Sequence, residues 1–84
     1  MIRMRDIFEM VARQPFQPFR IHCSDGSGHE VRHPELIKIS PTIVILFTPL
    51  EKYNYTAFDE SQTISILHIT RLEPLPTASK VKKS

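Results

Sequence analysis

The segment FRIHCSDGSGHEVRH, residues 19–33, indicates the fold class of the chain because it has the pattern of a β-hairpin. Apolar and polar residues alternate from Phe19 to Cys23, as they do in a strand with one buried face. Asp25-Gly26 supplies the residue types of a tight turn, and His29 to His33 returns as a second extended run. The hairpin predicts a mainly β protein.

The register of this hairpin decides which side chains share a face. A two-residue loop would put a charge opposite each apolar residue, so a three-residue loop of Asp25, Gly26 and Ser27 is predicted. On the inner face this loop pairs Cys23 with His29, Ile21 with Val31 and Phe19 with His33. On the outer face it pairs Arg20 with Arg32 and His22 with Glu30.

Four potential metal ligands fall in the hairpin: His22, Cys23, His29 and His33. The predicted register puts His22 on the outer face and the other three on the inner face. His29 and His33 would lie about 13 Å apart, at about 3.3 Å per residue, which is too far for one ion with bonds of about 2 Å. The sequence therefore predicts no metal site and no cofactor.

A short amphipathic helix is predicted before the hairpin, over about residues 4–13, because its apolar positions follow i, i+3, i+4, i+7 spacing. The proline after Gln14 ends it. The segment QPFQPF, residues 14–19, is predicted to be an extended arm that packs Phe16 and Phe19 on the core. The alternative is a polyproline-like ligand for an aromatic groove.

Further extended segments follow the hairpin. Thr42–Thr48 is the most apolar run and is predicted to be a central strand, whereas Leu36–Ile39 fits either a short strand or a helical turn. In Thr63–Glu73 the apolar residues change phase near Ile66, which predicts a bulge or a corner. The remaining predictions are an extended segment at Tyr53–Phe58 and a turn at Asp59–Gln62.

Together these elements describe one small domain over residues 1–74, mainly β with a short N-terminal helix and about five strands. The sheet is expected to be strongly bent or closed into a barrel, because open edges are a pairing hazard. Residues 75–84 have little to bury and are predicted to be a flexible basic tail.

Composition limits the classes of function. The chain of 84 residues is 40% hydrophobic and 24% charged with a net charge of +2, so it is expected to fold and is only weakly basic. One cysteine excludes an internal disulfide, and charges interrupt any N-terminal signal or membrane segment. A cytoplasmic location and no membrane association are expected.

Catalytic motifs are absent from the sequence, and both glycines fall in one turn. Cys23 shares the phase of Phe19 and Ile21 and is predicted to be a buried, inert thiol. The chain is therefore predicted not to be an enzyme.

The outer face of the hairpin is the candidate binding face. Arg20 opposite Arg32 is an unfavourable like-charge pair unless an acid or a ligand compensates it. Arginine binds oxyanions in a bidentate manner, so this face would suit phosphates or an acidic protein. The candidate residues are Arg20, His22, Arg32 and Lys38. The alternative is a solvated face neutralised by Glu30, Glu35 or Glu73.

The run QPFQPFRIHCSDGSGHEVRHPELIKIS, residues 14–40, with ILHITRLEP, residues 66–74, resembles a group of small bacterial proteins that share a QPFxPFxIH…DG…HPE pattern. This resemblance implies no activity. The order of helix and bent sheet also resembles SH3-like and Sm-like barrels, and the Sm-like proteins form rings that bind RNA. Their pattern has a glycine in the second strand and Asp-Asn before the third, and both are missing here. No RNA-binding residue is carried over.

The leading functional hypothesis is a small non-enzymatic interaction module whose partner is a protein, with a second copy as the first candidate. Strand edges at Thr42–Thr48 or Thr63–Glu73 would pair between chains. The alternative is an Sm-like RNA- or DNA-binding module that uses Arg20, His22, Arg32 and the basic tail. A metal-binding regulator is a third and weaker hypothesis.

Overall fold

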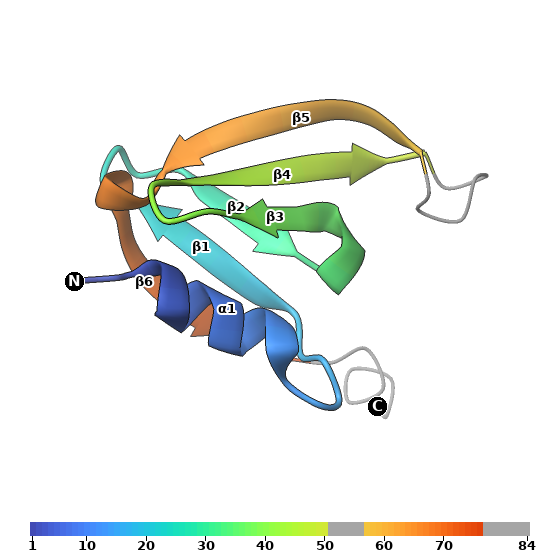
Figure 1. Cartoon of the computed structure of the whole chain (residues 1–84), viewed down its shortest axis with the longest axis horizontal. Helices are drawn as coiled ribbons and strands as arrows, with labels where there is room; N and C mark the ends of the chain where they lie inside the picture. Colours follow the sequence, from blue (N-terminus) through green and yellow to red (C-terminus); the bar gives the residue numbers. More distant parts are fainter. Residues whose placement is uncertain (51–56, 77–84) are drawn as a thin grey trace.

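The computed structural model describes residues 1–50 and 57–76. In this part of the chain one α-helix precedes six strands, which form two antiparallel sheets of three strands each (Figure 1). The elements are α1 (Met4–Ala12), β1 (Phe19–Cys23), β2 (Gly28–Val31), the 3-10 helix η1 (Pro34–Leu36), β3 (Ile37–Ile39), β4 (Ile43–Pro49), β5 (Phe58–Ser65), the 3-10 helix η3 (Ile66–His68) and β6 (Ile69–Pro74).

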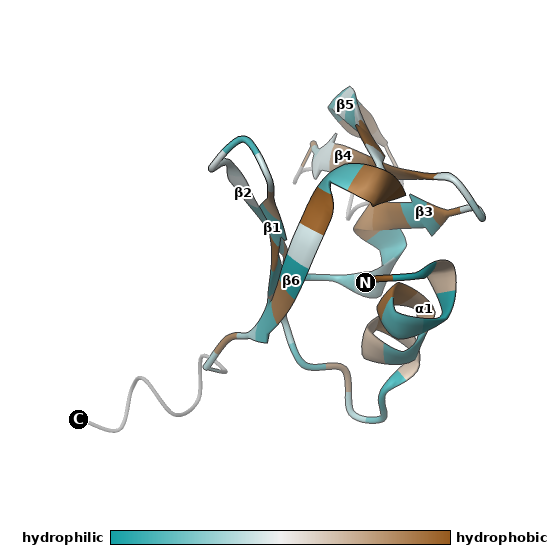
Figure 2. Ribbon diagram, turned by 90° about the vertical axis from the view of Figure 1, so that its left-hand side faces the viewer, coloured by the Kyte–Doolittle hydropathy of each residue, from teal (hydrophilic) through white to brown (hydrophobic). Residues whose placement is uncertain are grey.

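The two sheets have the strand orders β2-β1-β6 and β3-β4-β5. Figure 2 shows them as two layers, with α1 next to β3. The chain crosses between the layers at the two 3-10 helices, η1 and η3. Among the described residues no strand pairing joins the sheets, so the expected closed barrel is replaced by two packed sheets.

A single apolar core lies between the sheets and α1. Ile7, Phe19, Ile21 and Val44 are completely buried, and they come from α1, β1 and β4. The other buried members of the core are Met10, Val31, Ile37, Ile64, Ile66 and Ile69. In β1 the buried residues Phe19 and Ile21 alternate with half-buried ones, as expected for a sheet with one face in contact with water.

The N-terminal part of the chain agrees closely with the sequence analysis. The helix begins where the Arg3 backbone N–H donates to the carboxylate of Asp6 (2.8 Å), and it ends one residue earlier than predicted. In the arm that follows, Phe16 packs edge-on against Phe19 with ring centroids 6.3 Å apart. Its predicted packing on the core is confirmed.

Leu75 extends the packed part of the chain past the predicted boundary at residue 74. Its side chain is buried, and its backbone N–H donates to the Pro18 carbonyl (2.9 Å). The side chain of Gln17 donates to the Leu75 carbonyl (3.0 Å). Most of the predicted tail, residues 77–84, lies outside the described residues.

The hairpin has a three-residue loop, but it is Ser24, Asp25 and Gly26. The Gly26 N–H donates to the Cys23 carbonyl (3.0 Å), and Gly26 has φ of 90°, a conformation that favours glycine. The Asp25 carboxylate accepts a hydrogen bond from the Ser27 N–H (2.9 Å). The loop therefore starts one residue earlier than predicted, because the glycine is required at its third position.

This shift moves the register by two residues and changes every cross-strand partner. Phe19 lies opposite Val31, Arg20 opposite Glu30, Ile21 opposite His29 and His22 opposite Gly28. The predicted pairs, including Arg20 with Arg32 and His22 with Glu30, are therefore wrong. Because the shift is even, each side chain keeps its predicted face.

Three later predictions have mixed outcomes. The segment Leu36–Ile39 contains both predicted alternatives, because the 3-10 helix η1 ends at Leu36 and strand β3 follows. With β3 counted, the described residues form six strands instead of about five. Asp59–Gln62 is part of β5, so the predicted turn is wrong. The predicted corner near Ile66 is confirmed as η3. Of the predicted extended segment, residues 53–56 lie outside the described residues.

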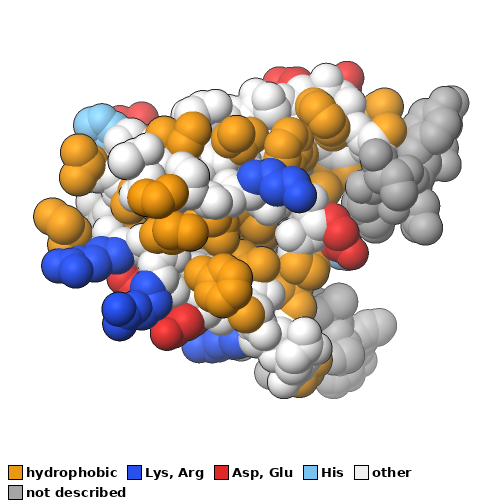
Figure 3. Space-filling model, viewed as in Figure 1, with side chains coloured by type: hydrophobic (Ala, Val, Ile, Leu, Met, Phe, Trp, Pro, Cys, Tyr) orange, Lys and Arg blue, Asp and Glu red, His pale blue; other side chains and the backbone are white. Residues whose placement is uncertain are grey.

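Large apolar side chains remain exposed on several elements, among them Phe8 on α1, Phe58 on β5 and Leu67 on η3. Figure 3 shows hydrophobic side chains gathered along β4 and β5 on one face of the molecule. No helix in the described part of the chain has the length and apolar character needed to cross a bilayer.

Candidate interaction surface

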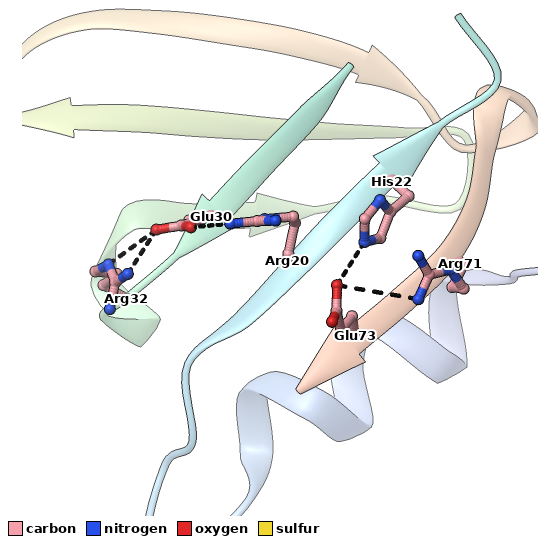
Figure 4. Close-up of polar contacts among 6 residues, drawn as sticks. All are labelled: Arg20, His22, Glu30, Arg32, Arg71 and Glu73. Carbon is pink, nitrogen blue, oxygen red and sulfur yellow. Dashed lines mark hydrogen bonds and ion pairs between the residues drawn. The ribbon is translucent and has the colours of Figure 1, made fainter. Parts of the chain in front are cut away.

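The predicted binding residues of the hairpin lie on the outer face of the β2-β1-β6 sheet, each beside a glutamate. Arg20 forms an ion pair with Glu30, and Arg32 contacts the other oxygen of the same carboxylate through Nη2 (2.7 Å) and Nε (3.0 Å) (Figure 4). Glu30 therefore bridges two guanidinium groups. The hydrogen bonds from Arg20 and then Arg32 lower the pKa of the Glu30 carboxyl.

The same arrangement recurs on the neighbouring strand β6. The Nε2 atom of His22 lies 2.8 Å from Oε1 of Glu73, and Nη1 of Arg71 lies 3.9 Å from that oxygen (Figure 4). The hydrogen bond with His22, and secondarily the charge of Arg71, lower the pKa of Glu73. Acids thus compensate the cations of this face, which was the alternative to an anion-binding face.

Lys38 is not part of this cluster. It lies on β3, in the other sheet, where it is exposed and stands opposite Ile45 of β4. The structure therefore brings Arg20, His22 and Arg32 together and separates Lys38 from them.

A cleft of about 490 Å³ opens between the hairpin loop and β5, and Cys23, His29 and His68 contribute to its lining. Cys23 is half-buried and packs against the core. The Ser27 hydroxyl donates to the Asp25 carboxylate (2.7 Å) and lies 3.2 Å from Nε2 of His29. Within residues 1–50 and 57–76, no cluster of three or more His, Cys, Asp or Glu side chains could hold a metal ion.

The β3-β4-β5 sheet has an apolar outer face that the sequence analysis missed. Val44 and Leu46 of β4 point to the core, so the alternate residues Ile43, Ile45 and Phe47 point outward. These three are half-buried and do not belong to the core cluster. They form a stripe along the central strand of the sheet.

Phe58 joins this stripe through an irregularity in the strand pairing. Thr48 pairs with Glu60 but Pro49 pairs with Phe58, so Asp59 is an extra residue in β5. Such a bulge changes the phase of the strand by one residue, and Phe58 stands beside Phe47 on the outer face. We call Ile43, Ile45, Phe47 and Phe58 the apolar stripe.

The edge of β5 is a second exposed feature of this sheet. Among the described residues β5 pairs with β4 alone, and residues 58–63 are all exposed. The Ile66 N–H donates to the Thr42 carbonyl (2.9 Å), which extends the ladder by one pair. Because hydrogen-bonded residues alternate in an antiparallel pair, Ile64 and Gln62 bond to β4. The backbone groups of Ser61, Thr63 and Ser65 therefore point to the free edge.

No protein-family model, curated protein or solved structure matches the chain. The surfaces of the molecule are therefore the basis on which a function can be inferred.

Proposed function

We propose that the protein is a small non-enzymatic interaction module that binds a second copy of itself by pairing the free edges of two β5 strands. The observation that carries this proposal is the direction of the backbone N–H and C=O groups of three residues of β5. In Ser61, Thr63 and Ser65 these groups point away from β4, toward the exposed edge of the sheet. Unpaired edge N–H and C=O groups are a template for a strand of another chain.

The sequence of β5 limits where pairing takes place. Asp59 and Glu60 place two carboxylates at its start, and the bulge distorts the ladder there. Charges and bulges are the usual protections of an edge. The uncharged remainder, Ser61 to Ser65, is the proposed pairing segment; Ser61 to Thr63 are exposed, and Gln62 to Ser65 line the cleft beside the hairpin loop.

An antiparallel pair centred on Thr63 satisfies this segment. It places Thr63 opposite its counterpart and Ser61 opposite Ser65 of the second copy. The backbone groups that point to the free edge in all three residues then form hydrogen bonds with the second copy. The acidic residues then lie beyond the paired segment. Thr-Thr pairs across strands are favourable.

The other predicted edge, Thr42–Thr48, does not support pairing. Strand β4 is the central strand of its sheet, as predicted, and its two sides are occupied by β3 and β5. Of the two predicted edges, only Thr63–Glu73 contains strand residues that lie at the edge of a sheet in the described part of the chain. Within it β5 is preferred to β6 because it is longer, with eight residues against six.

A protein partner is favoured over nucleic acid by the charge pairing on the hairpin face. Glu30 contacts both Arg20 and Arg32, so phosphate groups would have to displace an acid from each arginine. Lys38 lies on the other sheet and adds nothing to that face.

We also propose that the fold is a variant of the small SH3-like or Sm-like barrel. In this interpretation β2 and β3 correspond to one strand that is bent at η1. The corner at η3 before the last strand supports the same interpretation.

The test is Thr63→Lys, compared with Thr63→Ala, in sedimentation velocity of the full chain after nuclease treatment. Thr63→Lys puts two like charges directly opposite each other in the paired edges without removing a hydrogen bond to β4. Wild type and Thr63→Ala are expected at twice the 9.8 kDa chain mass or more, and Thr63→Lys as a monomer.

Circular dichroism checks that each variant keeps its fold. A wild-type monomer at about 100 µM, or Thr63→Lys with the wild-type mass, would rule out pairing through β5.

A further inference from the structure

We infer that the apolar stripe is a stacking surface between two edge-paired dimers, so that four copies form a sandwich of two six-stranded sheets. This inference rests on the proposed pairing of β5, and it assigns the outer face of the β3-β4-β5 sheet to further copies of the chain.

The stripe is an apolar surface without a covering element in the described part of the chain. Ile43, Ile45 and Phe47 project from the central strand, and Phe58 is 53% exposed although it contacts Phe47. A contiguous apolar surface of this kind marks an interaction site more often than a scattered exposed residue does.

The size of one sheet explains why a single copy does not provide a sufficient surface. Strands of three, seven and eight residues, at about 3.4 Å per residue and about 4.8 Å apart, have a footprint of about 290 Å². Stable interfaces bury about 800 Å² on each partner. One outer face alone is therefore too small to hold two monomers together.

Edge pairing through β5 removes this limit. It joins two copies into one sheet with the order β3-β4-β5-β5-β4-β3, and the outer face grows to about 590 Å². This area approaches the usual size of a stable interface. The edge contact and the face contact are therefore expected to form in that order as concentration rises.

The distribution of side chains on the enlarged face is self-complementary. Two apolar stripes flank a central strip of Ser61, Thr63 and Ser65 from both copies. Stacking by a two-fold axis that lies midway between the two sheets, parallel to both and perpendicular to the strands, sets stripe against stripe and strip against strip. Stacked sheets pack about 10 Å apart, and the small hydroxyl side chains of the strip permit that approach.

Charged residues lie at the margins of this face. Lys38 is on β3, the outermost strand, where its long side chain reaches water. Asp59 precedes the paired segment and so lies near the strand ends. Neither makes an ion pair among residues 1–50 and 57–76. The central strip of the face carries no charge, and Lys38 flanks the stripe, directly opposite Ile45.

The experiment measures mass over about 1 µM to 1 mM for the full chain by sedimentation velocity and native mass spectrometry. The wild type is expected to pass from dimer to tetramer. Ile45→Lys places a charge in the stripe and is expected to stop at the dimer, and Phe58→Lys serves as a second variant at a more exposed position. Thr70→Lys adds the same charge at an exposed position of β6, in the other sheet, and is expected to behave as wild type.

The outcomes separate the two proposals. A wild type that remains a dimer at 1 mM, or an Ile45→Lys and a Phe58→Lys that both form tetramers, overturns stacking and leaves β5 pairing in place. If Thr63→Lys still forms a dimer, and Ile45→Lys combined with it abolishes that dimer, the outer faces associate without pairing of the β5 edges. Both the proposed function and the order of assembly are then wrong.

Discussion

Phe58 contacts Phe47 across the outer face of the β3-β4-β5 sheet, with ring centroids 4.6 Å apart and planes inclined by 59°. The contact depends on the extra residue at Asp59. In a regular ladder Asp59 would stand opposite Pro49, and Phe58 would point to the other face. The bulge therefore moves a large aromatic side chain from the inner side of the strand end to the solvent side.

The aromatic pair is expected to be coupled energetically. A double-mutant cycle with Phe47→Ala and Phe58→Ala should give a coupling energy of about 0.5–1.5 kcal/mol, the range for aromatic pairs in contact. Urea unfolding at about 1 µM measures it without a contribution from association. Additive effects of the two substitutions would mean that the rings do not pack together in solution.

Neighbouring positions of β4 should differ sharply in their contribution to stability. Val44 is completely buried, so Val44→Ala is expected to lower the free energy of unfolding by about 2 kcal/mol through lost burial and a cavity. Ile45 is half-buried on the opposite face, and Ile45→Ala is expected to cost less than about 1 kcal/mol under the same dilute conditions. Equal losses would contradict the assignment of the two faces.

The two glycines of the hairpin should respond differently to alanine. Gly26 has φ of 90°, and Gly26→Ala is expected to cost about 1–2 kcal/mol from backbone strain although no atom lies within 4 Å of the new Cβ. At Gly28 the new Cβ would lie 3.2 Å from Cδ of Arg20, a flexible side chain that can move. Gly28→Ala is expected to change stability by less than about 0.5 kcal/mol.

Thermal unfolding of both glycine variants gives the comparison. A tolerated Gly26→Ala would indicate that the loop is not Ser24, Asp25 and Gly26, and the register of the hairpin would then have to be reassigned.

Elements with strong periodicity were predictable from the sequence. The helix follows from helical spacing, β1 from alternation and the central strand β4 from its continuous apolar run, and the packed structure retains all three. The face on which each hairpin side chain lies was also predictable, because a shift of register by two residues leaves every side chain on the same face. The cross-strand partners in the hairpin were predicted wrongly because both three-residue loops contain Gly26, and the positive φ of Gly26 requires it at the third position of the loop.

The candidate surface was less predictable because it depends on which strand is at an edge. Asp59–Gln62 is polar throughout and suggested a turn, yet an edge strand in water accepts polar residues on both faces. The run TIVILFT predicts a central strand. Apolar residues occupy both odd and even positions of this run, so both faces of β4 are apolar. A two-layer structure buries only one of these faces.

Glu30 should make stability depend on pH in acid. Its pKa is lowered in the folded state by Arg20 and Arg32, so its contribution is complete above the ordinary glutamate pKa, about 4.3, and is lost as pH falls through the lower folded value. Glu30→Gln is therefore expected to be less stable than the wild type at pH 7, with the difference shrinking below about pH 4.

Urea unfolding between pH 7 and pH 2.5 at low salt measures this difference, and added salt should reduce it because the ion pairs are exposed. Glu35→Gln is the matched control, since Glu35 makes no ion pair among the described residues. The two variants have the same change of charge, so a pH-dependent gap confined to Glu30→Gln would assign the effect to the Arg20–Glu30–Arg32 contacts. A gap of constant size down to pH 2.5, or the same gap in Glu35→Gln, would show that these contacts do not contribute to stability in solution.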